Sequence, residues 1–205
     1  MKIEIIDKKQ FSEIWVDGKK FREIDKFLYR NRLKRILQVS SVEELDGLLF
    51  KLDREVAYKL TYKLLALRGH MKLELEKKLK MRKIDPAVVA HVLQECESRG
   101  ILNDQREGDL FVDRQRAKGW GPSMIARRLR RKAPHLTGLA QISDEEERAM
   151  IDRLVEKRRS KHNFSDVKEK QKLYRFLKNR GFRDVLICES LFRGRIESEG
   201  DYGTG

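Results

Sequence analysis

The sequence predicts a mainly all-α protein, in which tandem three-helix repeats form an elongated curved array, with a small N-terminal β-hairpin element. Three observations lead to this prediction. Short helical segments recur between residues 53 and 192, apolar residues within them are spaced by four, and a basic residue followed by glycine recurs between segments. A glycine just past a helix supplies the left-handed conformation that many helix ends need. Because one unit has too small an apolar face to fold alone, the units are expected to stack.

The N-terminal stretch, residues 1–52, differs from the rest. Residues 3–6 and 13–16 mix β-branched and aromatic residues with polar ones, and Asp17-Gly18 separates the second run from Lys19-Lys20-Phe21. Asp-Gly between such runs is a strong hairpin signal. A helix is expected near residues 24–37, and a capping box that begins at Ser41 is expected to open a short helix.

Three repeats are predicted after this element. In the first repeat, residues 53–102, helices are expected over 54–67, from about Lys72, and after Asp85-Pro86, which combines an N-cap with proline in the first turn. The second repeat spans residues 103–155 and includes a capping box at Ser143. The third spans residues 156–192. Residues 193–205 are expected to be a disordered tail.

Composition narrows the classes of function. The chain has 205 residues, with 47 Lys and Arg against 33 Asp and Glu and a net charge of +14. Such an excess favours a polyanionic partner. No apolar run is long enough to span a bilayer, and the first residues do not read as a signal peptide, so we expect a cytoplasmic protein without a membrane partner.

Candidate metal, redox and catalytic sites are weak. Cys96 and Cys188 lie in apolar helical patterns and are expected to be buried thiols, and the four histidines lack partners at ligand spacing. Gly119-Trp120-Gly121-Pro122 lacks the further glycine of a dinucleotide fingerprint and the Lys of a Walker loop, so a helix–helix turn is the better interpretation. The acids of residues 144–147 suit the start of a helix. We therefore expect no enzyme activity, no cofactor and no metal.

The most informative feature is a basic run. Residues 114–142 contain eight Lys or Arg and no acid, and three of these residues are spaced three and four apart, opposite Ile125 and Leu129. A solvated face would normally mix both signs of charge. The run is therefore interpreted as a polyanion-binding surface made of Arg114, Arg116, Lys118, Trp120, Arg127, Arg128, Arg130, Arg131 and Lys132, with a second cluster at Lys157, Arg158, Arg159 and Lys161.

Trp120 has two interpretations. It is either a core anchor beside the turn or an exposed indole that touches a partner or stacks on a base. The sequence leaves both open.

Several motifs resemble the RecX family. The first repeat contains Arg68, Met71, Glu74, Leu75 and Leu79 in the family's opening pattern. The second contains the run Gly100–Asp104, and then Arg116, Lys118-Gly119-Trp120-Gly121-Pro122, Ile125 and Leu129. The third contains Phe176–Asn179, Arg180-Gly181-Phe182 and Ile187. These motifs occur in the family's order and together span about residues 53–192. The family usually has Ser where Met71 stands and Phe-Ala where Glu107-Gly108 stand here.

The resemblance implies a regulator of the RecA recombinase in DNA repair, recombination and the SOS response. Such proteins form a crescent of three-helix repeats that lodges in the groove of the RecA–DNA filament, blocks its extension and damps its ATPase and strand exchange. It implies RecA filaments as the partner, with only weak binding to single-stranded DNA alone. A monomer is expected, because no long apolar heptad pattern is present.

Two other hypotheses share the same basic run. The chain could be a DNA- or RNA-binding helical-repeat module that acts independently of RecA. It could also be an adaptor whose basic face meets an acidic protein, in which case its affinity for DNA would be low and depend little on salt.

Overall fold

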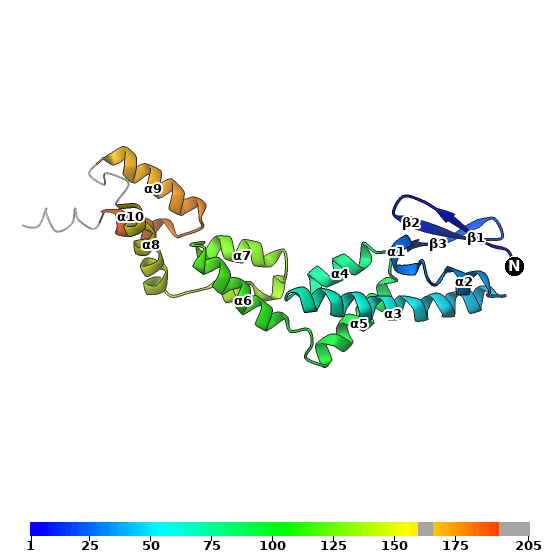
Figure 1. Cartoon of the computed structure of the whole chain (residues 1–205). Helices are drawn as coiled ribbons and strands as arrows, with labels where there is room; N and C mark the ends of the chain where they lie inside the picture. The colour runs from blue at the N-terminus through cyan, green and yellow to red at the C-terminus, as the bar shows by residue number, and fades with distance from the viewer. Residues whose placement is uncertain (160–165, 193–205) are drawn as a thin grey trace, which may run out of the picture. The chain divides into compact units, whose positions relative to one another are not determined.

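The computed structural model describes residues 1–159 and 166–192. It is mainly helical, with one small sheet at the N-terminus, which confirms the predicted fold class (Figure 1). The chain divides into two compact units, unit 1 with residues 1–104 and unit 2 from residue 105 onward. Within the described ranges, no helix combines the length and the apolar character needed to cross a membrane.

Unit 1 begins with an antiparallel sheet of three strands, one more than the predicted hairpin. The strands are β1 (Ile3–Asp7), β2 (Phe11–Val16) and β3 (Lys19–Asp25), in the order β1-β2-β3. Val16 pairs with Lys19, so Asp17 and Gly18 form a two-residue loop, and both have positive φ, at 48° and 77°. A type I′ turn requires that conformation, which confirms the hairpin between β2 and β3.

The helices of unit 1 differ from the prediction in two places. The segment expected as one helix near residues 24–37 is two short helices, α1 (Lys26–Tyr29) and α2 (Leu33–Leu37). The two helices expected after Ser41 are one helix of 26 residues, α3 (Val42–Leu67), with Ser41 as its N-cap. The hydroxyl of Ser41 accepts a hydrogen bond from the N–H of Glu44 at 3.1 Å. The predicted repeat boundary at residue 53 therefore falls inside a continuous helix.

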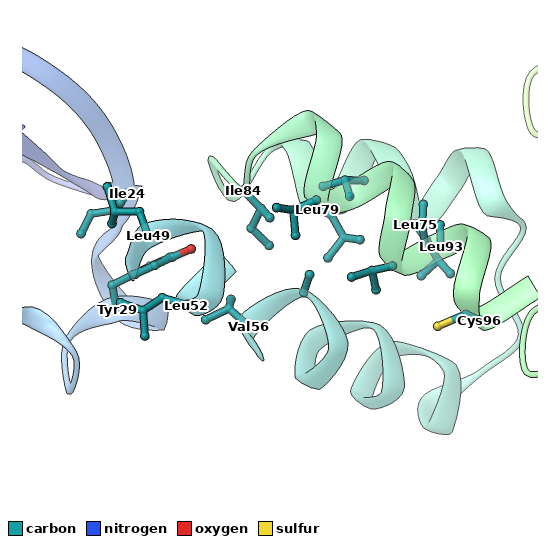
Figure 2. Packing of buried hydrophobic residues seen from close by; sticks show 14 of the residues in the cluster. Ile24, Tyr29, Leu49, Leu52, Val56, Leu75, Leu79, Ile84, Leu93 and Cys96 are labelled. Atoms are coloured by element: carbon teal, nitrogen blue, oxygen red, sulfur yellow. The ribbon is translucent and has the colours of Figure 1, made fainter. Parts of the chain in front are cut away.

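The remaining helices of unit 1 are α4 (Lys72–Lys80) and α5 (Pro86–Ser98), which start where the sequence predicts. They pack on α3 and bury a continuous apolar cluster (Figure 2). Val56 from α3, Leu79 from α4 and Leu93 from α5 belong to this cluster, and Cys96 is buried in it as predicted.

A buried carboxylate joins the sheet of unit 1 to its helices. Asp53, in the middle of α3, has no exposed surface and accepts hydrogen bonds from the hydroxyl of Tyr29 and the guanidinium of Arg22. It also accepts one at 2.8 Å from the backbone N–H of Asp85, just before α5. Burial and the neighbouring charge of Asp53 raise the pKa of Tyr29, so the phenol stays protonated and keeps donating.

Unit 2 contains five α-helices and one 3-10 helix in its described part. The α-helices are α6 (Asp104–Ala117, with its first residue at the boundary), α7 (Pro122–Arg130), α8 (Asp144–Arg159), α9 (Val167–Asn179) and α10 (Asp184–Phe192). Between α7 and α8 lies the 3-10 helix η1 (Pro134–Ala140), which the sequence did not predict. Ser143 and Glu146 exchange side chain-to-backbone hydrogen bonds, which confirms the capping box that opens α8.

Two details of unit 2 correct or refine the sequence analysis. Cys188 is exposed and is not a buried thiol, because the buried positions around it on α10 are Leu186, Ile187 and Leu191. Gly108 lies under η1, where an added Cβ would come within 2.9 Å of the side chains of Leu136 and Leu139. The glycine therefore lets η1 approach α6 closely.

The division into repeats stays a prediction. The proposed boundary between residues 155 and 156 lies inside α8, just as the boundary at residue 53 lies inside α3. The predicted tail at residues 193–205 lies outside the described residues.

Two turns of unit 2 are in backbone contact, and together we call them the glycine joint: residues 118–122 and residues 180–182. The N–H of Gly121 donates to the carbonyl of Arg180 at 2.8 Å, and the N–H of Ser123 donates to that of Gly181 at 3.2 Å. A Cβ on Gly121 would lie 2.6 Å from the carbonyl carbon of Gly181. Gly181 also has a φ of 86°, a conformation that favours glycine. The joint therefore requires glycine at both positions.

We predict that Asp53→Ala destabilises unit 1 by about 3–5 kcal/mol, because it removes the acceptor of buried donors from three segments. Hydrogen–deuterium exchange of the full chain should show faster exchange in β3 and α3. Asp46→Ala changes an exposed residue of the same helix and should leave exchange nearly unchanged. Equal exchange in the two variants would contradict a structural role for the Asp53 contacts.

We also predict that Gly121→Ala lowers the stability of unit 2 by about 1–3 kcal/mol, because the new methyl group forces the two turns apart. Thermal unfolding followed by circular dichroism measures the change. The matched control is Gly138→Ala, where an added Cβ meets no atom within 4 Å. If both variants melt alike, the contact between the turns is not tight in solution.

Candidate nucleic-acid interface

The structure divides the predicted basic residues by exposure. Within the described part of the chain, no carboxylate forms an ion pair with the exposed lysine and arginine side chains of the acid-free run. Their charge is therefore open to a partner. Exposed residues of the predicted set are Arg114, Lys118, Arg127, Arg130, Arg131 and, on α8, Lys157.

The helix α7 and its C-cap residue carry three of these residues on one face, which we call the α7 face. Ile125 and Leu129 are buried, with 1% and 0% of their surface exposed, and Arg127, Arg130 and Arg131 point away from them into solvent. Pro122 is in the first turn of α7, which confirms that residues 119–122 form a helix–helix turn. The helix thus holds its guanidinium groups on a surface that packing does not use.

Other members of the predicted set hold unit 2 together. The Nη2 atom of Arg116 lies 3.5 Å and 3.3 Å from the carbonyl oxygens of Leu139 and Gln141, to which it donates. Arg128 donates to the side-chain carbonyl of Gln115 at 2.6 Å. Lys132 lies over the ring of Phe111, 5.9 Å from its centroid. All three cations are half-buried, so their first role is in packing.

Trp120 is part of an alternating series of cations and rings. The guanidinium carbons of Arg128 and Arg180 lie 3.7 Å and 5.0 Å from its ring centroid. Arg180 also lies 4.7 Å from the ring centroid of Phe176, and Arg158 lies 3.7 Å from the same ring. We call this series, Arg128–Trp120–Arg180–Phe176–Arg158, the arginine–aromatic stack. Cation–π contacts of this kind contribute about 0.5–2 kcal/mol each.

Arg180 is not among the predicted site residues, although its motif contributes to the family resemblance. Its Nη1 atom donates to the carbonyls of Lys118 at 2.6 Å and Gly119 at 2.9 Å, which fixes its head group at the glycine joint. Burial, and then the charges of Arg158 and Arg128, lower the pKa of Arg180. The sequence did not indicate it, because the carbonyls that fix its head group are about sixty residues away along the chain.

The two predicted basic clusters meet around one cavity, which we call the basic hollow. It has a volume of about 500 Å³ and lies between the end of α6, α8 and α9. Met150, Leu154 and Phe176 contribute apolar surface, and none of the described residues that line it is acidic. Its cationic lining residues are Arg116, Lys118, Arg153, Lys157, Arg158 and Arg180.

The structure does not describe the side chains of two members of the second predicted cluster. Lys161 lies outside the described residues, and the side chain of Arg159 is likewise not described. The other two, Lys157 and Arg158, both line the basic hollow.

The acids at the start of α8 are used in packing. Glu147 is 1% exposed and accepts hydrogen bonds from the backbone N–H and the Nε of Arg183, at 2.7 Å and 2.6 Å. Asp144 pairs with the same guanidinium at 2.7 Å. Among the described residues, no group of three or more His, Cys, Asp or Glu side chains is placed to hold a metal ion.

Comparisons with known proteins agree with this architecture. The model of the third three-helix domain of RecX matches residues 144–184. The regulatory protein RecX of Halorhodospira halophila is 31% identical over 150 residues, which cover 69% of this chain and 90% of that protein. The regulatory protein RecX of Acinetobacter baylyi is 31% identical over 144 residues, covering 68% of this chain and 87% of that protein.

Two solved structures share the fold. A crystal structure of regulatory protein RecX aligns with a TM-score of 0.59 and 19% identity over 90% of this chain and 94% of that one. RecX from Lactobacillus salivarius aligns with a TM-score of 0.60 and 19% identity over 69% of this chain and 96% of that one. Together with the sequence relatives, these structures lead to one conclusion: the chain belongs to the RecX family of regulatory proteins.

Proposed function

We propose that this protein regulates a RecA-type recombinase, and inhibits it, by binding the groove of the RecA–DNA filament and modulating its ATPase and strand exchange. The observation that carries the proposal is the exposed cationic face of α7, which contains Arg127, Arg130 and Arg131 and no acid. Membership of a family of regulatory proteins supports it and favours a non-catalytic role. We propose that it acts in DNA repair and recombination as a monomer in the cytoplasm.

Electrostatics support a nucleoprotein partner. A filament with bound DNA is a dense polyanion, and cations that replace condensed counterions bind it more tightly at low salt. The exposed arginines can each form bidentate hydrogen bonds to phosphate or carboxylate groups. A face of this kind therefore suits both the DNA phosphates and acidic side chains of the recombinase.

The alternative function is direct DNA or RNA binding without any dependence on RecA. The same face favours it, because phosphate contacts carry no information about a protein partner. Comparing bare and RecA-coated DNA separates the two functions.

We predict that reversing Arg127, Arg130 and Arg131 to Glu abolishes the effect of the protein on RecA ATPase activity on single-stranded DNA, while helical content stays almost unchanged. Exposed substitutions usually change stability within about 0.5 kcal/mol each, whereas the reversal turns attraction to a polyanion into repulsion. The ATPase rate is measured across protein concentrations, with circular dichroism as the folding check.

The matched control for this variant reverses Lys51, Lys59 and Lys63, which are exposed on α3 in unit 1. Both triple variants undergo the same change in net charge. If the α7 variant slows the ATPase at wild-type concentrations, the α7 face is only a solvated surface.

We further predict tighter binding to RecA-coated DNA than to bare single-stranded DNA, with both affinities falling as salt rises. Fluorescence anisotropy over a salt series measures the two affinities. Equal affinities for bare and coated DNA would support the RecA-independent module, and little salt-dependent affinity for either would support an adaptor for an acidic protein.

A further inference from the structure

The basic hollow is distinct from the α7 face and is a second concentration of positive charge in unit 2. It gathers six cationic side chains from α6, α8 and the turns that follow α6 and α9, and no acid lines it among the described residues. Three of them, Arg116, Arg158 and Arg180, are half-buried. Like charges held together repel each other, so an assembly of this kind gains stability when an anion enters.

Two of the cations, Arg158 and Arg180, are held in place by contacts within the chain. Arg180 is tied to the carbonyls of Lys118 and Gly119, and both Arg158 and Arg180 lie against the ring of Phe176. A guanidinium that is already ordered loses less conformational entropy when it binds a ligand. The lowered pKa of Arg180 reflects the same crowding, since burial and the charges of Arg158 and Arg128 cause it.

The aromatic rings nearest the hollow are already in contact with arginines. Trp120 and Phe176 each have two guanidinium groups over them. Proteins that bind single strands through base stacking present open aromatic faces. In this site the rings orient cations, so the recognition chemistry is that of phosphate and not of bases.

The size of the hollow suits part of a polymer. A volume of about 500 Å³ exceeds the space that one phosphate group needs, and the apolar surface of Met150 and Leu154 can pack against a sugar. Lys157 and Arg153 also line the hollow and are exposed, so both can reach further phosphates of a bound strand.

We propose that the basic hollow binds the phosphodiester backbone of single-stranded nucleic acid through Arg153, Lys157, Arg158 and Arg180, without reading the bases. This deepens the proposed function, because it rests on a nucleoprotein partner and assigns the strand contact to a site other than the α7 face.

The test uses the full chain and a double variant, Arg153→Ser with Lys157→Ser. Both residues are exposed and lie outside the glycine joint and the arginine–aromatic stack, so the fold should persist. The matched control is Lys168→Ser with Arg175→Ser, which removes the same charge from exposed positions of α9 that do not line the hollow. Fluorescence anisotropy measures binding to a short labelled oligodeoxythymidine and to an abasic strand of equal length.

We expect the hollow variant to bind the oligodeoxythymidine about tenfold more weakly than the control. The slope of log affinity against log salt should also become shallower by about 0.7 for each phosphate that the variant no longer neutralises. The unmodified protein should bind the abasic strand as well as the thymidine strand.

Equal affinity of the hollow and control variants would overturn the proposal. A strong preference for thymidine over the abasic strand, or displacement of the strand by millimolar inorganic phosphate at constant ionic strength, would also overturn it.

The RecA ATPase assay separates this proposal from the proposed function. If the α7 reversal leaves RecA inhibition intact while the hollow variant loses strand affinity, the α7 assignment is wrong and the hollow remains. If the α7 reversal abolishes inhibition while the hollow variant binds strands as the control does, the hollow assignment is wrong and the proposed function remains.

Discussion

The backbone of Gly121 lies against the backbone of Gly181 with no side chain between them, and two hydrogen bonds between the turns hold this arrangement. The distance between the start of α7 and the end of α9 follows from that contact. It places the carbonyls of Lys118 and Gly119 within reach of Arg180. Arg180 in turn lies between Trp120 and Phe176, so the arginine–aromatic stack and the rim of the basic hollow both depend on two residues that have no side chain.

Unit 2 stabilises several of its half-buried cations without carboxylates. Arg116 donates hydrogen bonds to backbone carbonyls. Arg128 donates to the side-chain amide of Gln115 and lies over the indole of Trp120, and Arg158 lies over the ring of Phe176. Neutral partners compensate part of the desolvation of a guanidinium but leave its net charge unchanged. The region therefore keeps a positive field after folding, whereas ion pairs such as those between Arg183 and the acids of α8 cancel theirs.

Local patterns allowed much of the fold to be predicted. Asp17-Gly18 specifies its turn through the positive φ of both residues, and Ser143 with Glu146 specifies the start of α8. The face of α7 followed from the spacing of Ile125 and Leu129. The continuity of α3 could not be predicted, because an aspartate is a common N-cap and Asp53 therefore suggested the start of a new helix. Its hydrogen-bond donors, such as Tyr29, are distant in the sequence. The basic hollow was missed for a similar reason, since its walls come from segments near residues 116, 155 and 178, which no local spacing relates.

The carboxylate of Asp53 has a consequence for how unit 1 can be divided. This one side chain accepts hydrogen bonds from the last strand of the sheet, from the first short helix and from the residue just before α5. A chain that begins at α3 would keep Asp53 but lose Tyr29 and Arg22. The carboxylate would then be buried among apolar side chains without these two donors, which is unfavourable. The sheet and the helices behind it are therefore expected to fold and unfold together. A family member that lacks the sheet would need a different residue at this position, so residue 53 should covary with the presence of the N-terminal strands.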